Sequence, residues 1–376
     1  MTDVIVIGGG VVGASVAYHL VGLGAKTLLI DRQDPGRATN AGAGILSPQT
    51  SAYESPAWFN FAIEAVLYYD ILLEQLQQAQ VGDTGYAVCG LLNVAVSEDE
   101  IAPFEQTKQM IFDRQQQRGV PSAADLFEIS AREARDLFPA LTVVQKALYY
   151  RNAARVDGRL LAQALIRAAQ QQGLLVEQGG VERLMIGQGG VNGIVANSQT
   201  FSADNVVIAG GAWSPSFGRQ LGLTIPLEPQ RGQIIHLNLP QTDTSAWPII
   251  NAFREHYIVA WPEGRIAVGA TRETGSGFVP QATAAGLHEV TGEALRVAPG
   301  LAQAHFVEVR VGLRPLTRDT LPVLGAVPGI DNVYLATGHG PTGLQLGPYS
   351  GKLIADLISG QSPATDISAF SISRFS

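Results

Sequence analysis

The stretch that decides the fold is Asp3-Val-Ile-Val-Ile-Gly-Gly-Gly-Val-Val-Gly13, near the start of the 376-residue chain. Its run of β-branched residues, ended by glycine, predicts a buried parallel strand. Small and apolar residues over 14–23 predict a helix directly after it, and residues 26–30 predict a second strand that ends at Asp31. This order of elements is a βαβ unit, so the sequence predicts an α/β fold of the Rossmann type.

The glycines of this unit, Gly8-Gly9-Gly10-Val11-Val12-Gly13, fit the dinucleotide-binding pattern G-x-G-x-x-G. Gly8 permits the tight turn out of the strand, Gly10 lets the backbone approach a pyrophosphate, and Gly13 permits close packing of helix on strand. The helix N-terminus offers free N–H groups and a partial positive charge to phosphates. Asp31 follows Gly13 by 18 residues, where a carboxylate can accept both ribose hydroxyls. The unit therefore predicts a bound dinucleotide, without separating NAD from FAD.

Composition and charge narrow the class of protein. The chain is 46% hydrophobic and 15% charged, and its length predicts two domains or one large α/β domain with an insertion. A net charge of −8 argues against a nucleic-acid partner. We find no run of about 18 apolar residues that would predict a transmembrane segment. The N-terminal apolar stretch is too short for a signal peptide, so we expect a cytoplasmic protein. Cys89 is the only cysteine, which excludes an intramolecular disulfide and a thiolate metal cluster.

Strand–helix patterns recur at the start, middle and end of the chain, and two blocks between them alternate more like strands. Helical spacing covers 57–80, 101–118, 131–138, 160–172 and 347–359, and strand patterns cover 86–96, 174–177, 206–209, 333–336 and 247–271 around a turn at 263–264. We predict a nucleotide-binding domain of residues 1–81, 151–215 and 306–376, interrupted by an α+β substrate-binding domain of residues 82–150 and 216–305.

Two further segments favour FAD over NAD. FAD is the longer cofactor and must reach the second domain, so more than one segment should contact it. Ala38-Thr-Asn-Ala-Gly-Ala-Gly-Ile-Leu-Ser is small and flexible enough to pass under a flavin ring. Ala336-Thr-Gly-His-Gly-Pro-Thr-Gly-Leu-Gln-Leu-Gly-Pro opens the last helix, whose N–H groups could stabilise negative charge on a reduced flavin. For each segment taken singly, the alternative is a surface loop.

These segments belong to a set of markers that resembles the D-amino-acid oxidase family of flavoproteins, closest in pattern to glycine oxidase and the small D-amino-acid dehydrogenases. The markers extend over nearly the whole chain: the N-terminal glycine motif, Asn40-Ala-Gly-Ala-Gly-Ile-Leu, Gly210-Gly-Ala-Trp-Ser, Arg231-Gly-Gln, Tyr257-Ile-Val, Val268-Gly-Ala-Thr, Gly312-Leu-Arg-Pro-Leu-Thr-Arg-Asp and Ala336-Thr-Gly-His-Gly. The resemblance implies bound FAD, a Rossmann-type FAD-binding domain and a substrate domain built on an antiparallel sheet.

The resemblance also implies the residues that contact FAD. In this chain they would run from the pyrophosphate and ribose to the adenine clamp and the isoalloxazine ring. Val11, Val12 and Gly13 would meet the pyrophosphate, Asp31 and Arg32 the ribose region, and Val181 the adenine. The remaining positions are Gly8, Gly10, Ala38, Thr39, Ala43, Gly44, Ile45, Gly211, Trp213, Gly338, His339, Gly340, Thr342, Gly343, Leu344 and Gln345, with 339–345 along the isoalloxazine.

At the substrate end, Arg314 stands just before a proline that stiffens the turn. The planar guanidinium makes two parallel bonds to a carboxylate, and the resemblance implies that Arg314 holds the α-carboxylate of the substrate. The alternative is an arginine paired with Asp319 or Glu308. Tyr257 matches a pocket tyrosine of glycine oxidase, with a sheet aromatic as the alternative, and His339 could act through its ring or through its backbone alone.

Three departures from the family pattern bear on the chemistry. Pro341 stands where glycine oxidase has an arginine, which puts a glycine-only preference in doubt. The related sarcosine oxidases use a lysine that activates oxygen, but residues 255–275 contain no lysine, so O₂ and a quinone- or dye-type acceptor both stay open. Cys89 lies far from residues 312–315, so the cysteinyl-flavin link of those enzymes is absent and FAD should be non-covalent.

Together these observations predict an enzyme that oxidises the C–N bond of a small amino acid: a D-amino acid, glycine, or an N-methyl or cyclic analogue. Hydride would pass to flavin N5, and the imino acid would hydrolyse to a keto acid and ammonia. The alternatives are a sarcosine- or proline-type secondary amine dehydrogenase, an FAD-binding subunit of a larger assembly, and an NAD-dependent dehydrogenase. The sequence leaves open the substrate side chain, its stereochemistry and the oligomeric state, with a homo-oligomer among the possibilities.

Overall fold

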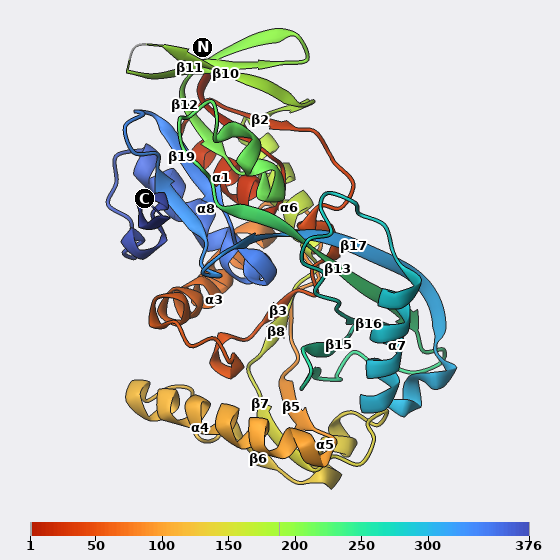
Figure 1. The fold of residues 1–376 in the computed structure, drawn as a ribbon. Helices are drawn as coiled ribbons and strands as arrows, with labels where there is room; N and C mark the ends of the chain where they lie inside the picture. Colours follow the sequence, from red (N-terminus) through yellow and green to blue (C-terminus); the bar gives the residue numbers. More distant parts are fainter. Residues whose placement is uncertain (1, 188, 376) are drawn as a thin grey trace.

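The computed structural model describes residues 2–187 and 189–375. Figure 1 shows two main sheets arranged along the long axis of the molecule, with both termini at the upper end. Each of the two has eight strands, and a third sheet of three short strands lies between them. Within the described residues no helix is long and apolar enough to cross a bilayer.

The first sheet contains the predicted βαβ unit. Its parallel core has the order β9–β2–β1–β12–β19, and β18 and the pair β10–β11 add antiparallel strands. The bounds are β1 Thr2–Ile7, β2 Thr27–Asp31, β9 Leu175–Gln178, β10 Val181–Gly187, β11 Gly190–Ala196, β12 Gln199–Ile208, β18 Val323–Ala326 and β19 Val333–Thr337. The continuous apolar run of β1 is buried on both faces, as the sequence predicts, because Val4 and Val6 pack into one core cluster and Ile5 and Ile7 into another.

Helices cover one face of this sheet. They are α1 Val11–Gly22, α6 Gly158–Gln171 and α8 Gly343–Ile358, with α3 Pro56–Gln78 packed against α8. The aromatic side chains of Trp58, Phe61 and Tyr69 on α3 are almost fully buried in this core. Burying such side chains stabilises a fold by about 1.5–3 kcal/mol each.

Helix α8 begins at Gly343, four residues before the predicted start. A proline often marks a helix boundary, yet Pro348 lies inside α8. Pro348 lacks the N–H that would bond the carbonyl of Leu344 four residues earlier. In the structure the hydroxyl of Tyr69, from α3, donates to that carbonyl instead. A tertiary contact therefore lets the helix continue through the proline.

The second sheet has the order β17–β13–β16–β15–β14–β5–β7–β6. The bounds are β5 Leu91–Ala95, β6 Leu126–Ile129, β7 Lys146–Tyr150, β13 Leu227–Asn238, β14 Ile249–Ala252, β15 His256–Ala260, β16 Arg265–Gly269 and β17 His305–Thr317. Every neighbouring pair is antiparallel except β14 and β5, which are parallel, so the expectation of an antiparallel sheet needs this one correction.

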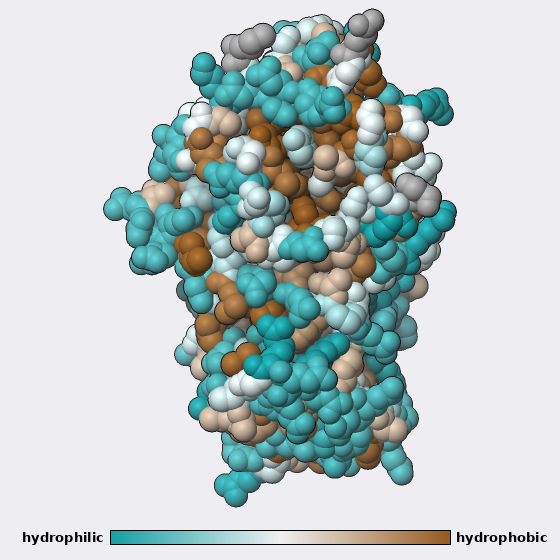
Figure 2. Space-filling view, turned by 90° about the vertical axis from the view of Figure 1, so that its left-hand side faces the viewer, coloured by the Kyte–Doolittle hydropathy of each residue, from teal (hydrophilic) through white to brown (hydrophobic). Residues whose placement is uncertain are grey.

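Helix α7, Ala284–Val297, packs on one face of the second sheet, and α4, Ile101–Arg118, packs on the other, with α5, Ala131–Leu137, near its lower edge. Helix α4 buries Phe104 and Ile111 against the strands. Figure 2 shows that the lower end of one side of the molecule, where α4 lies in Figure 1, is mainly hydrophilic. The glutamine-rich face of α4 thus lies in solvent.

The predicted strand over 86–96 is two strands, β4 Ala87–Val88 and β5, which belong to different sheets. Gly90 breaks the run, because its φ is +76° and a Cβ there would lie 2.6 Å from the hydroxyl of Tyr149. Strand β4 pairs with β8, Ala154–Arg155, which also pairs with β3, Ile45–Leu46.

Strand β17 bears on the predicted division of the chain. It pairs with β13 along its length in the second sheet, although the predicted boundary assigns residues from 306 onward to the nucleotide-binding domain. The chain then enters β18 of the first sheet. Strand β17 is thus the segment through which the chain returns from one main sheet to the other.

Candidate active site

A large cavity runs along the carboxyl ends of the parallel strands and reaches the second sheet. Its walls include the segments directly after β1, β2, β12 and β19, the loop at 37–45, and Tyr257 and Arg314. Ligands of open α/β sheets bind at this edge, where strand ends and helix starts meet. The cavity therefore has a nucleotide-like end at the first sheet and a second end at the other sheet, which we call the sheet end.

The turn after β1 is as tight as the glycine pattern predicts. Gly8 has a φ of +107°, and a Cβ there would lie 2.6 Å from the carbonyl oxygen of Ala209. A Cβ on Gly13 would lie 1.9 Å from the carbonyl oxygen of Gly8. Gly13 itself is outside the cavity wall, so its position serves the packing of α1 on β1. Gly8 and Gly10 both line the cavity.

The N-terminus of α1 faces the cavity with little compensating negative charge. Its first turn has no acidic residue, and Gly10 at the N-cap offers no side-chain bond. The N–H of Val11 donates to the hydroxyl of Thr39 at 3.0 Å, and both residues line the cavity together with Val12. A partial positive charge in a glycine-lined recess fits an anionic pyrophosphate.

At the nucleotide-like end, Asp31 is held by an arginine that the sequence reasoning missed. Arg37 Nη1 lies 3.0 Å from Asp31 Oδ2, and Arg37 Nη2 donates to the carbonyl of Gly9 at 2.5 Å. A Cβ on Gly9 would lie 3.0 Å from that carboxylate, so a glycine is needed for its close approach. No spacing rule marked Arg37, which lies six residues beyond Asp31.

Arg32 and Val181 also line this end of the cavity. The guanidinium of Arg32 pairs with Asp34 at 2.7 Å, and 53% of the Arg32 side chain is exposed. Its aliphatic part lies over Gly180, where a Cβ would be 3.1 Å from Cδ. The predicted adenosine positions are therefore together at one end, with Arg32 already paired to a neighbouring carboxylate.

The middle of the cavity lies between the short helix α2, Ala38–Ala41, with the loop that follows it, and the turn at 339–345. Gly44 has a φ of +76°, and a Cβ there would lie 1.8 Å from the carbonyl oxygen of Val156. Gln345 is buried and its Oε1 accepts from the N–H of Ser47 at 3.2 Å. Its Nε2 has no partner among the described residues. A buried donor without an acceptor costs about 1–3 kcal/mol, so this amide fits a polar ring edge.

His339 lines the cavity, but its ring nitrogen is engaged on the side of α8. Nε2 lies 2.9 Å from Oγ of Ser350, and burial lowers the pKa of His339 to about 3. The ring is therefore neutral at physiological pH. Gly338 and Thr342 lie outside the cavity wall: a Cβ on Gly338 would meet Thr317, and the hydroxyl of Thr342 donates to the carbonyl of His339.

The remaining predicted cofactor positions do line the cavity. They are Ala38, Thr39, Ala43, Gly44, Ile45, Gly211, Trp213, Gly340, Gly343, Leu344 and Gln345. Gly211 and Trp213 belong to the 3₁₀ segment Gly211–Phe217, directly after β12. Residues from three separate parts of the sequence thus enclose one space.

The sheet end brings Arg314 and Tyr257 together from different strands. Two glycines make the room: a Cβ on Gly232 would lie 2.5 Å from Arg314 Nη2, and a Cβ on Gly269 would lie 2.9 Å from the hydroxyl of Tyr257. Arg314 Nη1 donates to the carbonyl of Thr271 at 2.9 Å and to Oε1 of Gln230 at 3.3 Å. Both long side chains therefore lie flat across the sheet.

Arg314 has no carboxylate partner among the described residues. The two carboxylates considered from the sequence are paired elsewhere: Asp319 with Arg374 at 2.7 Å and Glu308 with Arg310 at 2.6 Å. Burial lowers the pKa of Arg314, and Tyr257 opposes this effect. Burial raises the pKa of Tyr257 against the influence of Arg314, so the hydroxyl is protonated. A guanidinium, which remains charged in proteins, and a neutral hydroxyl thus face the cavity without an acidic partner.

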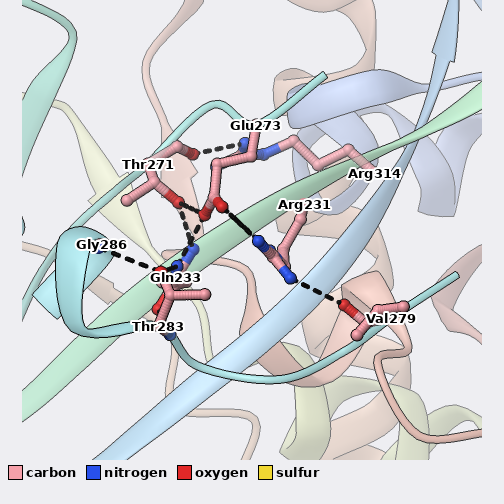
Figure 3. Close-up of polar contacts among 8 residues, drawn as sticks. All are labelled: Arg231, Gln233, Thr271, Glu273, Val279, Thr283, Gly286 and Arg314. Atoms are coloured by element: carbon pink, nitrogen blue, oxygen red, sulfur yellow. Dashed lines mark hydrogen bonds and ion pairs between the residues drawn. The ribbon is translucent and has the colours of Figure 1, made fainter. Parts of the chain in front are cut away.

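A polar network lies behind Arg314 on the other face of the sheet (Figure 3). Glu273 accepts from Arg231 Nη2 at 2.5 Å, from Gln233 Nε2 at 2.6 Å and from the hydroxyl of Thr271 at 2.7 Å. Burial raises the pKa of Glu273, but these hydrogen bonds outweigh it and hold the pKa below its usual value. The network fixes Thr271, whose carbonyl receives Arg314.

Sequence reasoning also missed Arg272, which lines the cavity at the sheet end. Arg272 directly follows the marker Val268-Gly-Ala-Thr. Its position next to that marker is the sequence feature that could have predicted its place in the pocket. Its guanidinium Nε lies 2.8 Å from Oε2 of Glu255, and 38% of the side chain is exposed.

This fold and this cavity define a class. A Rossmann-type unit with a recess suited to a pyrophosphate, joined to a sheet that presents an arginine to the same cavity, is the architecture of a dinucleotide-dependent oxidoreductase. Comparison with known proteins agrees with this class. Residues 3–357 match the model of the DAO family, described as FAD dependent oxidoreductase.

Individual relatives extend over almost all of the chain. An uncharacterized oxidoreductase, YurR, of Bacillus subtilis (strain 168) is 37% identical over 371 residues, covering 98% of each chain. The glycine oxidase of Pseudomonas aeruginosa is 31% identical over 367 residues, covering 96% of each. The crystal structure of iminodiacetate oxidase from Chelativorans sp. BNC1 is 37% identical with a TM-score of 0.93, covering 98% of each. The chain therefore belongs to the DAO family and is an FAD-dependent enzyme of the amine oxidase or dehydrogenase kind.

Proposed function

We propose that this enzyme oxidises the C–N bond of a small amino acid whose carboxylate binds Arg314. The observation that carries the proposal is the arginine itself: it is cationic, inward-facing, and without a carboxylate partner in the described chain. Charge-assisted hydrogen bonds to such a group are worth about 1.5–3 kcal/mol each. Arg314 and the hydroxyl of Tyr257 would hold the carboxylate from two directions.

FAD, when bound, supplies the two-electron acceptor for the C–N oxidation. The protein's own contribution is position and electrostatics. The carboxylate held at Arg314 directs the α-carbon toward the middle of the cavity, between the loop at 43–45 and the turn at 339–345. We assign the ring to this middle part, and the pyrophosphate to Gly10, Val11 and Val12.

The charges at the sheet end also favour a reactive amine. Arg272 and Arg314 both face the cavity there, and like charges disfavour the ammonium form of a bound amine. His339 is neutral and turned toward α8, so we assign the ring no proton transfer. A neutral amine needs no side-chain base before its C–H bond is broken. The product, an imino acid, hydrolyses in water.

The test is anaerobic bleaching of the purified holoenzyme by a panel of D- and L-amino acids, glycine, sarcosine, proline and iminodiacetate. We expect the absorbance band of the oxidised flavin, at about 450 nm, to disappear with at least one carboxylate-bearing amine. If no member bleaches the flavin, the proposal is wrong and a subunit of a larger assembly is the better description. Bleaching by the cyclic or N-methyl members alone would identify a secondary amine dehydrogenase. Repeating the reaction in air and with a dye separates oxidase from dehydrogenase.

A further inference from the structure

The alternation of the sheet places Arg272 on the same face as Arg314. Arg231 and Glu273 form an antiparallel bridge, and the N–H of Thr271 donates to the carbonyl of Gln233. Side chains that lie opposite one another in such a pairing share a face, and their chain neighbours point the other way. Thr271 and Glu273 therefore join the network behind the sheet (Figure 3), while Arg272 points into the cavity.

The backbone that carries Arg272 is held on both sides. Thr271 is fully buried and bonded to Glu273, and the N–H of Glu273 donates to the carbonyl of Arg231 at 2.9 Å. The side chain, in contrast, is held at the mouth by the single carboxylate of Glu255, which is 67% exposed. Exposed ion pairs of this kind contribute little to stability, so another carboxylate can replace Glu255 at small cost.

The sheet end therefore has more positive charge than one carboxylate can neutralise. Arg272 and Arg314 line it, and both cations act on Tyr257 and oppose the rise of its pKa. The acidic residues of the described cavity wall, Asp31 and Asp34, lie at the nucleotide-like end and are paired there. A monocarboxylate bound at Arg314 leaves Arg272 facing the cavity mouth with only an exposed partner.

We propose that Arg272 binds a second carboxylate of the substrate, so that amino dicarboxylates are preferred over the matching monocarboxylates. This inference rests on the proposed amino-acid oxidation. It gives the mouth of the cavity a role in specificity, distinct from the carboxylate anchor at Arg314. The second carboxylate could be carried on the nitrogen substituent, as in iminodiacetate, or on the side chain, as in aspartate.

The chemistry balances without another reactant. In iminodiacetate, one methylene C–H bond breaks and its electron pair leaves with the hydrogen to reduce the FAD that the family binds. The nitrogen proton passes to solvent, and a C=N bond forms. One water molecule then cleaves that bond to give glyoxylate and glycine. Glyoxylate is therefore the product to measure with iminodiacetate, whereas D-aspartate gives oxaloacetate and ammonia by the same steps.

Two substrate pairs test the proposal with the holoenzyme. Sarcosine and iminodiacetate differ by a carboxylate on the nitrogen substituent, and D-alanine and D-aspartate differ by one on the side chain. In at least one pair we expect kcat/KM to be about 10- to 100-fold higher for the dicarboxylate, the effect of one charge-assisted contact. The pair that shows the preference identifies where the second carboxylate binds.

Variants assign the preference to Arg272. In Arg272→Gln the dicarboxylate-to-monocarboxylate ratio should fall by about 10-fold or more, while Arg272→Lys, which retains the charge, should keep part of it. Arg132→Gln is the matched control, because that arginine is 91% exposed on α5, away from the cavity. If dicarboxylates are no better than their partners, or if Arg272→Gln leaves the ratio unchanged, the inference is wrong while the proposed function stands. If neither these pairs nor any member of the amino-acid panel bleaches the flavin, the proposed function itself is wrong.

Discussion

The two ends of the cavity are built in different ways. The nucleotide-like end is made mainly of backbone and of residues close in sequence, from Gly8 to Thr39, joined by residues 179–181, with glycines that admit close contacts. The sheet end is made of long side chains, Tyr257, Arg272 and Arg314, that lie far apart in the chain and share one face of a sheet.

This difference separates what the fold requires from what the substrate requires. At the nucleotide-like end, a side chain added at Gly8 or Gly13 would clash with backbone atoms. The fold therefore requires glycine at these positions. At the sheet end the pleat supports the side chains, and one can be exchanged with little effect on the strands. We therefore expect substitutions at the two ends to separate into effects on FAD binding and effects on substrate use.

The largest expected effect comes from the sheet end. Arg314→Ala should lower kcat/KM for the preferred amino acid by about 10²–10⁴-fold, because two charge-assisted bonds of about 1.5–3 kcal/mol each are lost. FAD content should stay near that of the parent protein. The measurement is steady-state kinetics with the flavin absorbance as the measure of loading.

Arg318→Ala is the control, since Arg318 is exposed, four residues further on, and outside the cavity wall. It should retain the parent kinetics. An Arg314→Ala enzyme with unchanged kinetics on every amino acid would contradict the anchoring role. Loss of FAD from that variant would contradict the separation of the two ends.

At the other end, Gly10→Ala should weaken FAD binding by about 10- to 100-fold, as expected when one or two contacts to phosphate oxygens are displaced. A Cβ there would touch the protein only at the hydroxyl of Thr39, 3.2 Å away, so the free energy of unfolding of the apoprotein should change little. Titration of apoprotein with FAD gives the dissociation constant.

The matched variant is Gly292→Ala, in the middle of α7, where a Cβ would meet no atom within 4 Å. It should leave the FAD affinity unchanged and stabilise the fold by up to about 1 kcal/mol. Equal FAD affinities in Gly10→Ala and the parent protein would remove Gly10 from the pyrophosphate recess.

The same difference decides how much could be predicted from sequence. The βαβ unit, the turn at Gly8 and the close packing of α1 on β1 at Gly13 are local patterns, and the structure has them where they were expected. The neighbourhood of Arg314 and Tyr257 was predicted through the resemblance, and the structure brings both to one cavity. Their roles remain proposals.

The residues that were missed depend on register or on contacts between distant elements. Arg272 faces the cavity because of the bridge between Arg231 and Glu273, and the pairing of a strand cannot be found from one sequence. The carbonyl of Leu344 that Pro348 leaves without its helical partner in α8 accepts from the hydroxyl of Tyr69, 275 residues earlier in the chain. The break at Gly90 depends on Tyr149 in a neighbouring strand.

A substitution with a smaller expected effect on kinetics tests whether the network around Glu273 aligns Arg314 at the sheet end. Glu273→Gln removes the charge that holds Arg231 and weakens the support of Thr271, so Arg314 should be less well aligned. We expect KM to rise about 3- to 10-fold with a smaller change in kcat, the loss of part of one charge-assisted bond. Glu228→Gln, an exposed glutamate on the same strand as Arg231, is the control. A fall in kcat of similar size, with no change in KM, would argue against a role of Glu273 in carboxylate binding.

The smallest expected effect concerns His339, which lies where the two ends meet. Its folded-state pKa of about 3 is below the ordinary histidine value of about 6.5, so the unfolded chain binds a proton that the folded protein excludes. This contribution to stability is fully present above pH 6.5 and is lost as the pH falls toward 3. Between pH 7 and pH 6 the protonation of this histidine in the unfolded chain should lower the free energy of unfolding by up to about 1 kcal/mol.

The His339→Asn variant lacks this histidine. Its free energy of unfolding should therefore fall less between pH 7 and pH 6 than that of the parent protein, by the contribution of His339. The buried His19 and His236, whose pKa values are lowered to about 4, titrate alike in both proteins and cancel in the comparison. Urea unfolding of the two holoproteins at both pH values provides the measurement. An identical fall in the two proteins would mean that the ring of His339 is accessible to protons in the folded state. The ring would then face the cavity, and its exclusion from proton transfer at the substrate would have to be abandoned.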